Sequence, residues 1–372
     1  MIRFNSIESL RAWMAWWVVV GHALHLAGFS TKATDSGEQV NILLHLLLRG
    51  GTAVNVFIII SGFVIAHLLI TKHEAYKNYI VRRWFRLFPI FLFSLTLAIL
   101  LKPLYLAAYT EFSWVYAFEM RIERANLEDD NFFKHLILHL TMLHGIIPEE
   151  ILKYASSSFL APAWSLSLEW QFYLLAPFLV FAISRSLKLT LIITFVSLSL
   201  FYWINDVSAF SWKYNSFLLL SMPHFLIGIA SRFLIENFNS KRLFWVLVTI
   251  LPCFLGDKLA VIIWFIFVPI LMYEANLTKL PRVFTPITNI LFFNVVIQTL
   301  GKWSYSTYLI HIQIFSIFVG GFVVINNGNL TQPVAWLLIL IACIVTVPVS
   351  WLLYKTIEKP FIKIGAKLTQ KS

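Results

Sequence analysis

Two polar residues in the first long apolar run, Arg11 and His22, are spaced so that they could act together. Eleven helical positions at about 100° each return to within about 20° of the same face, about 16 Å further along the axis. One face should therefore carry a fixed cation and, three turns away, a titratable imidazole. An imidazole inside a membrane can act as a general base or as a nucleophile. The alternative is an arginine that extends to the membrane surface and a histidine bonded to a neighbouring helix.

A carboxylate that could serve this imidazole is Glu169, which lies within the segment Trp164–Trp170. If that helix enters from the outer side, Glu169 lies about 10 Å below its outer end, at the same depth as His22. A carboxylate that orients and charges an imidazole is a recurring catalytic arrangement. We therefore predict that His22 and Glu169 are the catalytic pair, with a purely structural pair as the alternative.

Basic residues gather where the third apolar run begins. Arg83 and Arg86 are three positions apart and share a helix face. Guanidinium groups suit phosphate, so these residues, with Arg11, are candidates for holding an anionic substrate at the inner face. The alternative is charge that only sets the topology of the chain.

Other polar residues interrupt apolar runs and are candidates for lining a cavity. Ser61 precedes Gly62, and such a small pair either places a hydroxyl in a tunnel or lets two helices approach closely. His311 and His224 lie inside later runs, where each is either a cavity residue or a histidine bonded within the core.

Metal ligands are not expected. His135 and His139 have the spacing of a helical metal pair, but no carboxylate or cysteine completes a set at suitable spacing. The two cysteines, Cys253 and Cys343, lie in apolar runs and are expected to be buried as small hydrophobes. We predict no metal and no bound cofactor.

The elements that position these residues are expected to be membrane helices. The 372 residues are 59% hydrophobic and only 13% charged, whereas soluble domains carry about 25% charged residues. The sequence therefore predicts an all-α integral membrane protein with about ten transmembrane helices. The expected helices lie near residues 10–29, 52–70, 87–107, 162–182, 190–204, 216–234, 243–255, 258–273, 303–325 and 334–354. The shorter apolar segments 133–147 and 284–299 are expected to be interfacial or re-entrant.

The net charge of +11 is best explained by the topology of the chain rather than by binding to nucleic acid. Most lysines and arginines fall on one alternating set of loops, which includes both ends of the chain with Arg3 and Lys371. Both termini are therefore expected to be cytoplasmic, and the number of spans even. We predict one transmembrane domain over residues 1–372, with an outer loop at 108–160 and a short cytoplasmic tail at 355–372.

Six motifs in the same order resemble those of acyltransferase family 3, a bacterial family of membrane O-acyltransferases that act on cell-surface polysaccharides and related glycans. The resemblance runs nearly end to end, and the short tail resembles the stand-alone form of the family. The motifs are Ile7–Arg11 with His22 (R-x10-H), Phe57–Phe63, Arg83–Pro89 (R-x-x-R before a proline), Trp164–Tyr173 (W-S-L-x-x-E and F-Y), Leu300–His311 (G-x-x-S-Y-S-x-Y-L-x-H) and Glu358–Pro360 (E-x-P).

The resemblance implies an O-acetyltransferase of the bacterial inner membrane. Its co-substrate would be cytoplasmic acetyl-CoA or another acyl-CoA, and its acceptor a hydroxyl of an outer glycan or glycolipid. His22 would act as general base or transient acyl carrier, with Glu169 orienting it. The residues expected to bind the donor or line its path are Arg11, Arg83, Arg86, Ser61, Tyr305 and His311.

The competing interpretation is a proton-coupled transporter that uses its intramembrane histidine and glutamate residues. The sequence shows no symmetry between its two halves and no pair of broken helices. Transport would also leave the arginine cluster unexplained, so the enzyme is favoured.

Overall fold

The structure, a computed structural model, describes residues 4–30, 41–72, 74–237 and 241–370, and within these ranges the chain is helical without strands. Arg3 and Lys371, which the charge argument used, lie outside the described residues. The α-helices are α1 (Ser6–Leu26), α2 (Ile42–Leu48), α3 (Gly50–Thr71), α4 (Tyr76–Leu100), α5 (Lys102–Tyr109), α6 (Phe118–Asp130), α7 (Phe132–Leu140), α8 (Trp164–Arg185), α9 (Leu187–Asp206), α10 (Leu218–Glu236), α11 (Arg242–Ile250), α12 (Lys258–Glu274), α13 (Thr285–Phe292), α14 (Val295–Lys302), α15 (Ser304–Phe315), α16 (Gly321–Ile325), α17 (Gln332–Leu353) and α18 (Lys359–Leu368). Short 3-10 or π segments are η1 (His144–Ile146), η2 (Ala161–Ala163), η3 (Leu251–Phe254), η4 (Ser316–Gly320) and η5 (Tyr354–Glu358).

Seven helical segments of the described chain are long and apolar enough to cross a membrane, which is fewer than the ten expected. They contain α3, α4, α8, α9, α10, α15 with α16, and α17 with α18. The other three expected spans correspond to α1, α11 and α12. The α11 and α12 helices have 9 and 17 residues and are short for a straight span. The α1 helix has 21 residues, but polar side chains such as Arg11 and His22 lower its hydropathy.

Two expected boundaries are corrected by the structure. The α4 helix begins at Tyr76 rather than near residue 87, so the arginines of the third run lie inside the helix. The last helix does not end near residue 354, because a π segment joins α17 to α18 and helix continues to Leu368. Most of the expected tail is therefore helical. Both errors have one cause, since an apolar run marks only the part of a helix that is apolar on every side.

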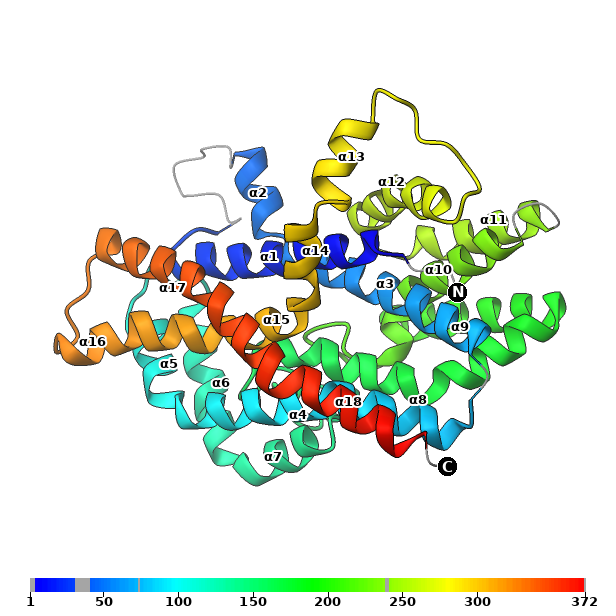
Figure 1. Ribbon diagram of the computed structural model, residues 1–372. Coiled ribbons are helices and arrows are strands. Elements are labelled where there is room, and N and C mark those ends of the chain that lie inside the picture. The colour runs from blue at the N-terminus through cyan, green and yellow to red at the C-terminus, as the bar shows by residue number, and fades with distance from the viewer. Residues whose placement is uncertain (1–3, 31–40, 73, 238–240, 371–372) are drawn as a thin grey trace.

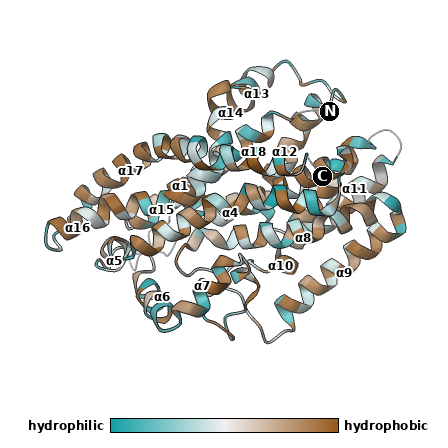
Figure 2. Ribbon diagram, turned by 60° about the horizontal axis from the view of Figure 1, so that its bottom comes forward, coloured by the Kyte–Doolittle hydropathy of each residue, from teal (hydrophilic) through white to brown (hydrophobic). Residues whose placement is uncertain are grey.

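The start of α1 and the end of α18 lie at the same end of the bundle, and α16 lies at the opposite end (Figure 1). Near α16 lie α5, α6 and α7, which with the connection up to α8 form what we term the outer cap (Figure 1). Figure 2 shows the long helices coloured mostly hydrophobic, with hydrophilic colour on α6. The cap therefore offers polar surface at one end of an apolar bundle.

Two long helices of the core, α3 and α10, pack closely against each other. A Cβ on Gly62 would lie 2.4 Å from the Phe225 carbonyl oxygen, and one on Gly228 would lie 2.1 Å from the Ile59 carbonyl oxygen. Only glycine permits this approach of two backbones. The prediction that the Ser61–Gly62 pair permits close helix contact is therefore confirmed, and the contact holds one wall of the central cavity in place.

Candidate active site

A polar cavity lies among α1, α3, α4, α8, α10 and α15, and we term it the central cavity. Its volume accessible to water-sized groups is about 60 Å³, which suits a narrow chain rather than a bulky ring system. Five residues predicted from sequence to form the site line it, namely Arg11, Ser61, Arg86, Glu169 and Tyr305. The structure thus brings together side chains from five different helices.

The carboxylate of Glu169 is bonded to hydroxyl groups rather than to an imidazole. Ser61 Oγ donates to Glu169 Oε1 at 3.4 Å, and the Tyr173 hydroxyl donates to the same oxygen. The predicted bond between His22 and Glu169 is not among the contacts of the described residues. Matched depth on two helices was not sufficient, because the facing direction of each helix also decides which side chains meet.

The partner of His22 is His311, with His22 Nδ1 and His311 Nε2 2.7 Å apart. His311 Nδ1 lies 3.2 Å from the Thr307 carbonyl oxygen. A carbonyl only accepts, so we assign the proton of neutral His311 to Nδ1, and His311 Nε2 then accepts from His22 Nδ1. This leaves the lone pair of His22 on Nε2, which has no hydrogen-bond partner in the described structure. The two histidines thus form a hydrogen-bonded relay that orients the ring of His22.

The three predicted arginines have different surroundings. Arg11 forms an ion pair of 4.0 Å with Glu8. The Arg83 guanidinium lies over the rings of Tyr79 and Tyr173, at 5.9 and 5.6 Å from their centroids. Such contacts hold a cation without neutralising it, so Arg83 keeps its charge between two rings, one of which, Tyr79, lines the inner cavity described below.

A buried carboxylate that the sequence analysis did not single out is Glu358, which is 3% exposed. Ser306 Oγ donates to Glu358 Oε2 at 3.0 Å, and Arg86 interacts electrostatically with this carboxylate. The motif Glu358–Pro360 could have identified this residue from the sequence. However, the sequence analysis predicted a cytoplasmic tail at residues 355–372, outside the bundle. Because the helix continues, Glu358 enters the bundle, where it acts electrostatically on Arg86 without an ion pair of 4.0 Å or less among the described residues.

A larger cavity, which we term the inner cavity, lies where α3, α8 and α10 end and α4 begins. Its volume accessible to water-sized groups is about 690 Å³. Tyr76 and Phe178 line it with rings 5.3 Å apart, and Tyr79 connects it to the cation contact of Arg83. Lys72 also lines it, and partial burial with the charges of Arg82 and Arg83 lowers the pKa of Lys72. The cavity thus combines aromatic rings with one lysine and the two carboxylates of Glu74 and Glu236.

The remaining candidate histidines lie elsewhere. His224 Nε2 accepts from the Asp257 backbone N–H at 3.0 Å, so it fixes the start of α12 and is outside the central cavity. His139 and His144 stack in the outer cap with ring centroids 4.0 Å apart. In the described part of the chain, no group of three or more His, Cys, Asp or Glu side chains is placed to hold a metal ion.

Fold and site together define a multi-pass helical membrane protein with a polar cavity inside its bundle. The sequence model of a family described as an acyltransferase domain matches residues 4–355, which is nearly the whole chain. The chain therefore belongs to acyltransferase family 3, and this membership supports a membrane acyltransferase activity. No curated protein and no solved structure matched the chain.

Proposed function

We propose that this membrane acyltransferase moves an acetyl group from cytoplasmic acetyl-CoA to a hydroxyl of an extracytoplasmic glycan, such as an O-antigen, an exopolysaccharide or a glycolipid. The proposal includes about ten spans in a bacterial inner membrane, with both termini in the cytoplasm. The observation that carries it is the relay Thr307–His311–His22, whose free nitrogen belongs to the first-helix motif of the family.

The donor side of the proposal rests on the inner and central cavities. The inner cavity has room and aromatic rings for an adenine ring, and Lys72, with Arg82 and Arg83 close enough to act on its charge, would meet the phosphates. The thin pantetheine arm would pass Tyr79, Arg83 and Tyr173 into the central cavity. Arg86 and Arg11, which line that cavity, would face the thioester end.

The transfer step follows from the tautomer of His22. Nε2 of His22 takes the proton of the acceptor hydroxyl while its oxygen attacks the thioester carbonyl carbon. The carbon–sulfur bond breaks, the new ester forms, and the leaving thiolate takes the proton from the imidazolium as CoA departs. His311 keeps the ring of His22 oriented, as the third member of a catalytic triad does. Attack by Nε2 itself, with a transient acyl-histidine, is the other form of the same proposal.

The role of His22 can be tested with radiolabelled acetyl-CoA and membranes that contain the endogenous glycan. Removing a general base costs roughly 10²–10⁴-fold in rate, so His22→Ala should lose nearly all label in glycan. His45→Ala is a matched control, since His45 is exposed on α2 and lines neither the central nor the inner cavity. Equal labelling by wild type and His22→Ala would remove His22 from the mechanism. Absence of labelling in wild type would contradict the donor or the acceptor.

A further inference from the structure

The last helix, α18, presents a row of basic side chains on its exposed surface. Lys359, Lys363 and Lys367 recur at every fourth position, and all three are exposed. Successive members are turned by only about 40° around an α-helix, so they form one strip, which we term the lysine stripe. Lys355, one turn earlier in η5, is also exposed, and its Nζ lies 5.0 Å from the centroid of the Trp351 ring. Positive charge therefore begins where α17 ends and continues along α18.

Large apolar side chains occupy the neighbouring strip of the same helix, which we term the apolar stripe. Its members Phe361, Ile364 and Leu368 are exposed, and helical spacing places them about 100–160° around the axis from the middle of the lysine stripe. The remaining side of α18 is buried against α4, where a Cβ on Gly365 would lie 2.7 Å from the Phe85 Cβ. The exposed surface of α18 thus carries charge along one strip and apolar groups along the next.

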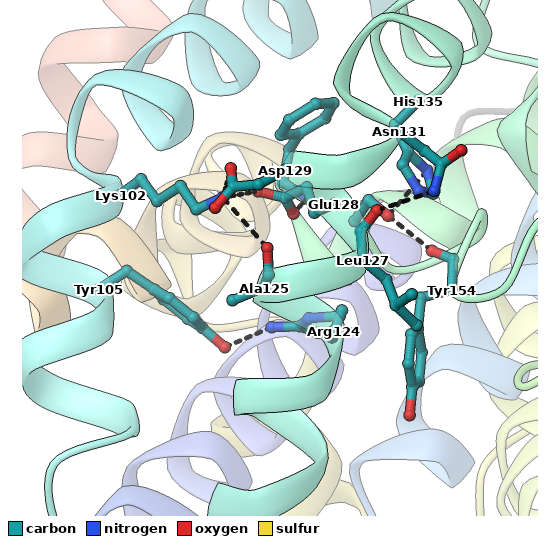
Figure 3. Close-up of polar contacts among 12 residues, drawn as sticks. Lys102, Tyr105, Arg124, Ala125, Leu127, Glu128, Asp129, Asn131, His135 and Tyr154 are labelled. Carbon is teal, nitrogen blue, oxygen red and sulfur yellow. Dashed lines mark hydrogen bonds and ion pairs between the residues drawn. The ribbon is translucent and has the colours of Figure 1, made fainter.

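The lysine stripe has no acidic counterpart. The segment 359–370 contains no Asp or Glu, and none of its lysines forms an ion pair within the described part of the chain. Lys102 in the outer cap differs, because a carboxylate oxygen of Glu128 lies 2.9 Å from its Nζ (Figure 3). Water alone can solvate three lysines, but it does not favour three large apolar groups beside them. The two stripes together therefore indicate a partner that is both anionic and apolar.

The length of the last helical segment places α18 at the membrane surface. Residues Gln332–Leu368 form one segment of 37 residues, which is about 55 Å long at about 1.5 Å per residue. The hydrocarbon core of a bilayer is about 30 Å thick, and the 22 residues of α17 suffice to cross it. Trp351 near the end of α17 is exposed, which is typical of aromatic residues at headgroup level. The segment runs obliquely across the bundle (Figure 1), so α18 continues within the headgroup region.

Contacts with α4 fix which side of α18 faces outward. Arg82 Nη1 donates to Thr369 Oγ1 at 3.4 Å, just beyond the end of α18. The rings of Phe85 and Phe361 stack with centroids 6.4 Å apart. Together with the close approach at Gly365, these contacts prevent α18 from rotating about its axis. The two stripes therefore keep their directions in the absence of a partner.

We propose that α18 binds the headgroups of anionic phospholipids, with the lysine stripe on their phosphate groups and the apolar stripe among the adjoining acyl chains. A lysine near an anionic leaflet favours binding by roughly 5-fold, and its methylene stem lies along apolar surface while the ammonium reaches the headgroup. Lysines beside an apolar face are the composition of helices that lie in the membrane interface. The residues of the two stripes line neither the central nor the inner cavity, so this binding does not depend on the proposed reaction.

The test measures lipid binding to the purified full-length protein in neutral detergent by native mass spectrometry. The probes are dioleoyl phosphatidylglycerol, which is anionic, and dioleoyl phosphatidylcholine, which has the same acyl chains and no net charge. We expect phosphatidylglycerol to bind at least roughly 10-fold more tightly, because three lysines meet its charge. Equal affinity for the two lipids would overturn the proposal. A soluble peptide of glutamate residues that binds in place of phosphatidylglycerol would also overturn it and assign the surface to an acidic protein.

Variants of the lysine stripe show whether the preference belongs to α18. The triple variant Lys359→Gln, Lys363→Gln and Lys367→Gln should lose most of the preference for phosphatidylglycerol. Arginine at the same three positions should keep it, because the positive charge remains. The matched control changes three exposed lysines that lie outside α18 to glutamine, namely Lys134, Lys153 and Lys213, and should lose much less. An equal loss in both glutamine variants would assign the effect to net charge and refute the site on α18.

A variant of the apolar stripe separates a lipid from a soluble anion. Ile364→Gln combined with Leu368→Gln keeps every charge of α18 but removes exposed apolar surface. It should weaken the binding of phosphatidylglycerol, because the acyl chains lose their contact with the helix. Unchanged binding of phosphatidylglycerol by this variant would contradict the proposed role of the apolar stripe.

Discussion

The inner and outer ends of the bundle hold their arginines in different ways. At the inner end Arg232 forms an ion pair of 3.4 Å with Glu236 one turn along α10. In the outer cap Arg121 and Arg124 share only the hydroxyl of Tyr105. The cap does contain acids, but two of them, Glu128 and Asp129, bind Lys102 instead.

This difference indicates which end is complete without a ligand. An arginine paired within the fold is stabilised whether or not a substrate is present. A buried arginine that faces a neutral oxygen contributes little until an anion arrives. At the inner end Arg232 is therefore paired with an acid within the fold, whereas Arg121 and Arg124 in the outer cap share a neutral oxygen, with no carboxylate within ion-pair distance among the described residues.

The largest expected effect on stability comes from removing the buried cation that acts on Glu358 in the middle of the bundle. Arg86→Leu should leave the carboxylate of Glu358 buried without its cation and lower the free energy of unfolding by about 3–5 kcal/mol. Unfolding by detergent titration in mixed micelles measures this change. The double variant with Glu358→Gln should recover most of the loss. No recovery would show that the two charges do not depend on each other.

Low pH should destabilise the outer cap, because the cap also buries histidine rings that have no acidic partner. Burial lowers the pKa of His144 to about 4, and burial together with the nearby charge of His144 lowers the pKa of His139. Their ordinary value in an unfolded chain is about 6.5. The folded values are lower, so stability is complete above pH 6.5 and falls as the pH drops toward 4, by roughly 2 kcal/mol at pH 5. Thermal unfolding at pH 7.5 and pH 5 measures this.

A variant that removes the titratable ring sharpens the same prediction. His144→Gln should unfold at nearly the same temperature at both pH values if His144 carries most of the effect. A pH dependence as steep as that of wild type would place the responsible groups elsewhere.

The smallest expected change in stability is at the unbalanced end. Arg124→Leu should alter the free energy of unfolding by less than about 1 kcal/mol, because replacing an uncompensated buried cation by an apolar side chain relieves desolvation while it loses one hydrogen bond. The same detergent titration, run beside Arg86→Leu, compares the two ends directly. A loss as large as that of Arg86→Leu would mean that Arg124 is structural and that the two ends do not differ.

Much of the candidate site could be predicted from local pattern. Arg11, Ser61, Arg86, Glu169 and Tyr305, which the sequence analysis placed among the site residues, line one cavity. A polar residue within a long apolar run requires a reason to be there, and helical periodicity states which polar residues share a face. The position of a polar residue in an apolar run and the face it shares are properties of a single helix. Both can therefore be predicted from residues that are close in sequence.

What sequence could not supply is the contact between helices far apart in the chain. The bond from His22 to His311 joins residues 289 positions apart, and it replaced the predicted pairing with Glu169. Glu358 entered the bundle only because a helix continued past its apolar part. Relative rotation of the packed helices decides such contacts.

By itself the sequence determined a helical membrane protein, the membership of its family and the residue types available for chemistry. These follow from composition and from spacing along single helices, where the physics is local. Only the tertiary structure decided that two histidines form the relay and that Arg121 and Arg124 meet without an acid. Those outcomes depend on how helix faces pack against each other, because a side chain's partner is the group that packing places beside it.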